Sequence, residues 1–165
     1  VPGSYGVVYV PLKPVALRAA MGCAIAVMVL TALSSLYMVT WRGVEFADFS
    51  WVGFAAIGGL VIWQLWEGAR WAHILIIIHC ALYLLLNLTG LLLLPFLSQI
   101  GVPILDVVGI AGAYHYGDPN VFFMLLIGRT AIDVILHIAI IVLLCQPQVG
   151  QYIQMRGDLR RMGVK

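Results

Sequence analysis

Charged residues are scarce in this chain of 165 residues: they make up 10% of it, whereas 63% of the residues are hydrophobic. A soluble domain usually carries about a quarter charged residues. The mean hydropathy of +1.05 therefore excludes a soluble domain and predicts an integral membrane protein. The net charge of +2 gives no reason to expect a nucleic-acid partner, and the length predicts one domain, 1–165.

Cysteines and catalytic motifs are equally sparse. Cys23, Cys80 and Cys145 are odd in number and lie inside apolar runs, so they predict no disulfide framework. They form no CxxC pair, and we expect no metal site. The chain also lacks GxSxG, HExxH and a glycine-rich phosphate loop. We therefore expect a protein that is not an enzyme.

Four long apolar runs organise the sequence, at about 16–41, 49–67, 72–96 and 120–145. A membrane-spanning helix needs roughly 20 apolar residues. Only helices and closed barrels satisfy the backbone in lipid, and continuous rather than alternating runs indicate helices. The runs predict an all-α integral membrane protein with four transmembrane helices in an antiparallel bundle.

The basic residues predict how this bundle is oriented. With four spans, one side of the membrane receives Lys13, Arg18, Arg70, Arg156, Arg160, Arg161 and Lys165. The other side receives only Arg42, and the outer loop 97–119 has no Lys or Arg at all. Because cytoplasmic segments are enriched in Lys and Arg, both termini are predicted to be cytoplasmic. A bacterial inner (plasma) membrane is the expected location.

Two polar segments lie on the predicted cytoplasmic side. The connection EGARWAH, residues 67–73, is short, so it predicts a tight hairpin with Glu67 in a solvated turn. The basic tail 146–165 begins where Pro147 ends the fourth span. Its membrane-surface anchor is Arg156, Arg160 and Arg161, each stabilising headgroup binding by about 1 kcal/mol.

The end of the fourth span carries a weak resemblance. The stretch LLCQPQVGQYI, residues 143–153, resembles the close of many small four-span bacterial proteins, in which a proline and a tyrosine follow the last helix. The resemblance is consistent with the membrane setting and implies no activity.

Polar residues recur at intervals of four in the third and fourth spans. We call them the polar ladder: His79, Tyr83 and Asn87 in the third span, and Arg129, Asp133 and His137 in the fourth. Residues four apart share one face of a helix. In antiparallel spans with these boundaries, His79 is level with His137, Tyr83 with Asp133, and Asn87 with Arg129. A charge at the bilayer centre costs about 2.5–3.5 kcal/mol, so we expect the two stripes to face each other.

The polar ladder supports three functional interpretations. The favoured one is a non-catalytic accessory or partner-binding subunit without a cofactor, whose partner is another membrane protein or a second copy of the chain. One alternative is a b-type cytochrome-like electron-transfer subunit, in which His79 and His137 bind haem b. The other alternative is a proton or ion relay through the same seam.

Overall fold

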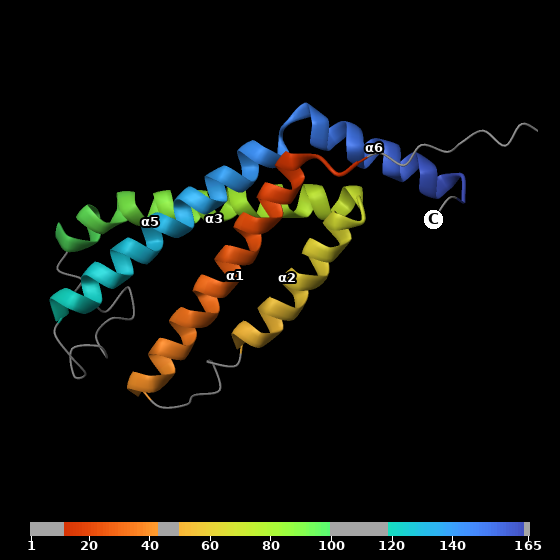
Figure 1. The fold of residues 1–165 in the computed structure, drawn as a ribbon. Coiled ribbons are helices and arrows are strands. Elements are labelled where there is room, and N and C mark those ends of the chain that lie inside the picture. Colours follow the sequence, from red (N-terminus) through yellow and green to blue (C-terminus); the bar gives the residue numbers. More distant parts are fainter. Residues whose placement is uncertain (1–11, 43–49, 100–118, 164–165) are drawn as a thin grey trace, which may run out of the picture.

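The computed structural model of the chain describes residues 12–42, 50–99 and 119–163, and every regular element in these ranges is a helix (Figure 1). The elements are α1 (Val15–Arg42), α2 (Ser50–Trp66), α3 (Arg70–Gln99), α5 (Pro119–Leu144) and α6 (Pro147–Arg161). The predicted all-α class is confirmed for this part of the chain. The outer loop 97–119 lies almost entirely outside the described residues.

Three helices are long and apolar enough to cross a membrane. Among the described residues, the segments that meet this criterion are Val15–Leu36 of α1, Arg70–Thr89 of α3 and Ile127–Leu144 of α5. Helix α2 has 17 residues, which at 1.5 Å per residue gives about 25 Å, compared with about 30 Å for the hydrocarbon core. The three long helices agree with the predicted membrane protein, and a fourth span through α2 stays a prediction.

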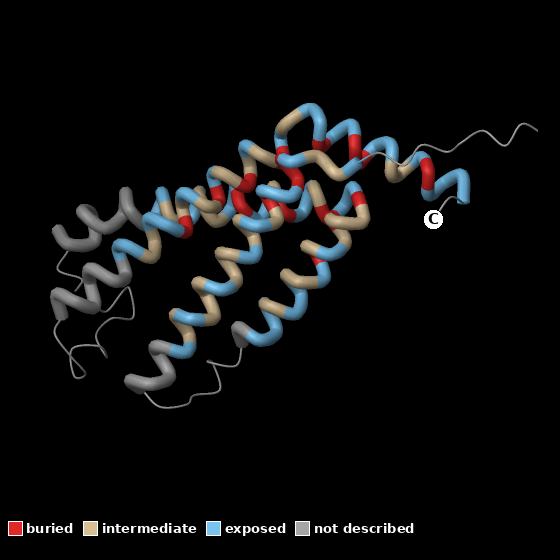
Figure 2. Tube along the Cα trace, viewed as in Figure 1, coloured by how far each residue is buried: buried red, intermediate tan, exposed pale blue. Residues whose placement is uncertain are grey.

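The helices converge at one end of the molecule, which we call the α6 end. The start of α1, the turn between α2 and α3, and the end of α5 meet beside α6 there (Figure 1). The buried residues gather at the same end, as Figure 2 shows. The largest fully buried side chains are Leu17, Leu65, Cys80, Leu144 and Val149. Away from the α6 end, described residues of α1 and α2 are exposed or half-buried.

Helices α2 and α3 diverge from their shared turn (Figure 1), so the predicted tight hairpin is wrong. Their buried residues lie near the turn: Val61 and Leu65 on α2, and Ala72, Ile76 and Cys80 on α3. Gly68 makes the reversal with a φ of 77°, a conformation that glycine adopts without steric cost. A short connection makes the helices neighbours at the turn but does not set the angle between them.

The segment predicted as a tail folds into α6. Pro147 ends the hydrogen bonding of α5 because it has no N–H, and it also begins α6, since its fixed φ suits the first turn of a helix. Helix α6 buries Val149, Tyr152, Ile153 and Leu159. Arg156, Arg160 and Arg161 are therefore carried on a helix that packs against the bundle.

Polar contacts also join α6 and the segment before α1 to the α2–α3 turn. Arg160 Nη2 donates to the Glu67 carbonyl at 2.9 Å and lies 3.5 Å from Glu67 Oε2, so Glu67 is bound by α6 as well as by solvent. Lys13 Nζ lies 3.4 Å from the centroid of the Trp66 ring, a cation–π geometry. Burial lowers the pKa of the Lys13 ammonium, and Glu67 opposes this shift.

We expect Gly68→Ala to destabilise the α6 end. A Cβ at Gly68 would lie 2.8 Å from Arg156 Cβ and would also occupy a positive φ, which costs roughly 1–2 kcal/mol before the clash is counted. The measurement is unfolding in detergent micelles. Gly150→Ala in α6 is the control, because a Cβ there meets nothing within 4 Å. Equal stability of the two variants would contradict the packing of α6 on the turn.

Candidate functional site

The polar ladder lies along the contact between α3 and α5. His79, Tyr83 and Asn87 are carried by α3, and α5 carries the other three residues. The structure brings four ladder residues together across the seam: His79, Tyr83, Asp133 and His137. Asn87 bonds within its own helix instead, with Nδ2 donating to the Tyr83 carbonyl at 2.9 Å.

The His137 ring packs against two rings of α3. Its centroid lies 3.9 Å from that of Tyr83, with 11° between the planes, so the two rings are stacked. The His79 ring is farther away, at 6.0 Å and 43°. Side chains on a helix lean toward its N-terminus. On antiparallel helices Tyr83 and His137 therefore lean toward each other, which displaces the contacts by one turn from the predicted levels.

His137 and Asp133 are the buried polar residues of the seam, with 2% and 4% of their surface exposed. His137 Nδ1 lies 2.6 Å from the backbone carbonyl of Asp133. Because a carbonyl only accepts, Nδ1 carries the proton and donates. The backbone carbonyl of Asp133 thus fixes the tautomer and orientation of the imidazole. The side-chain carboxylate of Asp133 is left for other partners.

The Asp133 carboxylate has one oxygen paired and one unpaired. Oδ2 lies 3.5 Å from Arg129 Nε, one turn earlier on α5. Oδ1 is buried and has no hydrogen-bond partner among the described residues. A buried acceptor without a donor costs about 1–3 kcal/mol, and more when it is charged. The Tyr83 hydroxyl of α3 also interacts with this carboxylate across the seam, but Oδ1 is left without a well-formed hydrogen bond.

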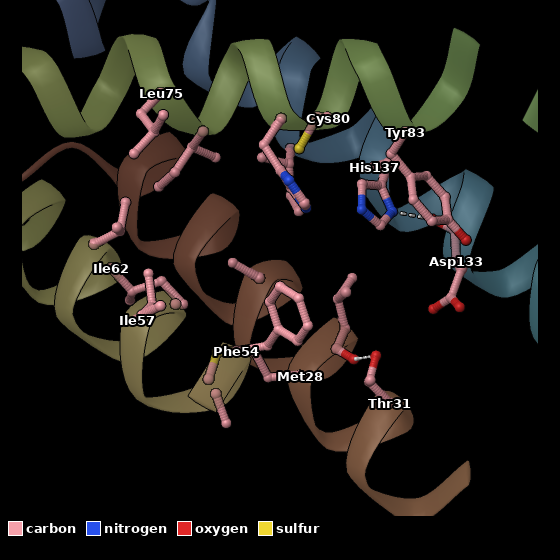
Figure 3. Close-up of a pocket in the computed structure, with 18 of the residues that line it drawn as sticks. Met28, Thr31, Phe54, Ile57, Ile62, Leu75, Cys80, Tyr83, Asp133 and His137 are labelled. Carbon is pink, nitrogen blue, oxygen red and sulfur yellow. Dashed lines mark hydrogen bonds between the residues drawn. The ribbon is translucent and has the colours of Figure 1, made fainter. Parts of the chain in front are cut away.

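A cavity of about 550 Å³ opens beside Asp133, between α1, α2, α3 and α5 (Figure 3). Five ladder residues line it, all except Asn87. The facing walls come from α1 and α2 and are apolar, with Met28, Phe54 and Ile57 among their side chains. The sequence patterns do not predict this cavity, because it depends on how far α1 and α2 stand from α3 and α5.

His73 makes a contact between α3 and α5 that was not predicted from the sequence. Its Nε2 lies 3.0 Å from the carbonyl of Leu144, the last residue of α5. The last carbonyls of a helix have no partner within it, and the start of α6 at Pro147 prevents α5 from continuing. A histidine donor on α3 therefore satisfies an end carbonyl of α5 and holds the two helices together at the α6 end.

The three predicted anchor arginines are engaged to different degrees. Arg160 contacts Glu67, and Arg161 Nη1 lies 3.8 Å from Asp158 Oδ1. Arg156 packs at Gly68, and its Nε is buried without a partner among the described residues. Contact with lipid headgroups stays a prediction for all three.

The described part of the chain has no cluster of side chains suited to bind a metal ion. No group of three or more His, Cys, Asp or Glu side chains there is arranged to hold a metal ion. Comparison of the chain with known families, with curated proteins and with solved structures finds no match. The function must therefore be argued from the seam and its cavity.

We expect Arg129→Leu alone to destabilise the protein more than Arg129→Leu with Asp133→Leu. The single substitution leaves the buried carboxylate without its cation, whereas the pair removes both charges. Removing one partner of a fully buried ion pair costs about 3–5 kcal/mol. Because Arg129 is 38% exposed, we expect the single variant to be destabilised by about 1–3 kcal/mol more than the double variant.

The double-mutant cycle is measured by unfolding in micelles, with Asp133→Leu as the other single variant. Additive effects of the two substitutions would contradict an energetic coupling between Arg129 and Asp133.

Proposed function

We propose that the chain is a non-catalytic subunit of a membrane complex, and that a partner covers the open side of α5 around Arg129. In this proposal the protein has four spans, lies in a bacterial inner membrane and keeps both termini in the cytoplasm. The partner is another membrane protein or a second copy of the chain.

The depth and exposure of Arg129 carry the proposal. Arg129 lies ten residues after the first residue of α5, which is about 15 Å along the helix at 1.5 Å per residue. It lies 15 residues before the last residue, Leu144, which is about 22 Å. Arg129 thus lies well inside α5 and within its apolar segment Ile127–Leu144. Its side chain is 38% exposed and has Asp133 as its ion-pair partner. Since a charge at this depth is costly in lipid, a polar group from a partner would stabilise it.

Open glycines on the membrane helices support the same proposal. Gly22 on α1, Gly53 and Gly59 on α2, and Gly128 on α5 each face space in which an added Cβ would meet nothing within 4 Å. Small residues let transmembrane helices approach closely. These faces are not used for packing among the described residues, and Gly128 adjoins Arg129.

The four-span topology has two supports. The basic residues fall almost entirely on one side when α2 is counted as a span. The structure places the start of α1, the α2–α3 turn and the end of α5 together (Figure 1), as alternating spans require. At 17 residues, α2 is at the lower limit for a membrane helix.

We expect Arg129→Leu/Asp133→Leu to release the partner. This double variant removes the polar contact without leaving a lone charge, so it should remain folded. Native mass spectrometry of the gently extracted protein should show a fixed stoichiometric complex for the wild type and at least a tenfold smaller complexed fraction for the variant. Arg161→Leu is the control, because that side chain is 85% exposed. A monomeric wild type, or an unchanged complex in the double variant, would refute the proposal.

A haem-binding subunit is the second candidate, and the approach of two histidines favours it. The rings of His79 and His137 are 6.0 Å apart on neighbouring helices. The bond from Nδ1 of His137 to a backbone carbonyl is typical of metal-binding histidines and leaves Nε2 as the nitrogen for a ligand. When bound, haem b would supply one-electron transfer, and His79 and His137 are the residues that would hold its iron.

The absorbance spectrum tests this candidate. A haem subunit purified from its native membrane should show a Soret band that is lost in both His79→Ala and His137→Ala, because bis-histidine ligation needs both rings. His73→Ala is the matched control, since His73 bonds a carbonyl at the α6 end. A native preparation without the band would exclude haem as the resident group.

A further inference from the structure

We infer that the cavity between α1, α2, α3 and α5 binds a neutral, membrane-soluble phenol of the quinol type, with a ring hydroxyl donating to Asp133 Oδ1. The inference goes beyond the proposed subunit function and does not depend on it, because the cavity is formed by this chain alone. It rests on the cavity's volume, on the unsatisfied carboxylate oxygen and on the chemistry of the two walls.

The volume matches a small molecule. The cavity holds about 550 Å³, within the range of roughly 300–1,000 Å³ that is usual for ligand sites. One turn of a helix with its side chains, 10–12 Å wide and 5.4 Å long, occupies about 400–600 Å³. The cavity therefore accommodates one ring with a short apolar tail but not a transmembrane helix of a partner.

The unpaired oxygen defines the head group as a hydrogen-bond donor. Asp133 is 4% exposed, lines the cavity, and its Oδ1 has no partner among the described residues. A carboxylate oxygen at this depth only accepts, and an unmade bond to it is costly. A bound hydroxyl would supply the missing donor.

The neighbouring charges require that this donor be neutral. Arg129 and Asp133 lie 3.5 Å apart, so the polar wall carries one charge of each sign. A cationic head group at Asp133 would lie beside the Arg129 guanidinium, and an anionic one would face the carboxylate. A hydroxyl avoids both repulsions, and its own lone pairs accept from Arg129 or His79, which also line the cavity.

The apolar walls favour an aromatic ring with a hydrocarbon tail. Phe54 and Met28 lie on the α1 and α2 side, across from His137 and Tyr83 (Figure 3). Aromatic rings and methionine sulfur both stabilise a bound ring beyond simple area burial. Toward the α6 end the lining continues with Val61, Ile62 and Leu75, where an isoprenoid tail would be buried.

Equilibrium dialysis of the purified protein in detergent micelles tests the inference. The probe is a benzoquinol with one isoprene unit, kept reduced under anaerobic conditions, and empty micelles correct for partitioning. We expect saturable binding of one equivalent. Ala55→Phe, which places a ring in the cavity, should weaken binding at least tenfold. Ala56→Phe is the matched control, because Ala55 lines the cavity and Ala56 does not.

A second comparison uses only the wild-type protein and so does not depend on a variant folding. The dimethyl ether of the same quinol has no donor, and we expect it to bind at least tenfold more weakly. Absence of saturable quinol binding, or equal affinity of the Ala55→Phe and Ala56→Phe proteins, would overturn the inference. Equal affinity for the quinol and its ether would overturn the assignment of Asp133 Oδ1 as the acceptor.

Discussion

A carboxylate buried within a membrane helix is the constraint on which the rest of this site depends. Asp133 is almost fully buried, and each group around it responds to its charge or its backbone. Arg129 pairs with one carboxylate oxygen, and His137 is oriented by the Asp133 carbonyl and stacked on Tyr83. What remains is one unsatisfied acceptor beside a cavity. That acceptor is the observation from which we infer a hydrogen-bond donor in the cavity.

Packing and hydrogen bonds at the α6 end hold the helices together. Leu17, Leu65, Leu144 and Val149 are fully buried there, and His73 and Arg160 bond backbone carbonyls of α5 and of the α2–α3 turn. Because the helices are fixed together at this end, they can diverge toward the other end and leave an open cavity between them instead of a close-packed core. A fold that concentrates its packing in this way leaves the polar side chains of the seam beside a cavity.

Much of the fold was predictable because membrane helices follow from composition. Each predicted span has a helix that begins and ends within three residues of it, since the hydrocarbon core sets the length of apolar runs. The meeting of the two stripes of the polar ladder was predictable from spacing alone. The contacts between the stripes are displaced by one turn, which stacks Tyr83 on His137. Predicting this shift would have required the direction in which helical side chains lean. The end of α5 at Pro147 was predicted. The start of α6 at the same proline was not.

By itself the sequence determined the all-helical class, the membrane character and the two stripes of the polar ladder, because these depend on the hydropathy and spacing of residues along one helix at a time. Only the tertiary structure decided the divergence of α2 from α3, the docking of α6, the bond of His73 and the cavity beside Asp133. These features depend on the angles and distances between helices. Such angles arise from packing between residues far apart in the chain, which periodicity within a helix does not encode.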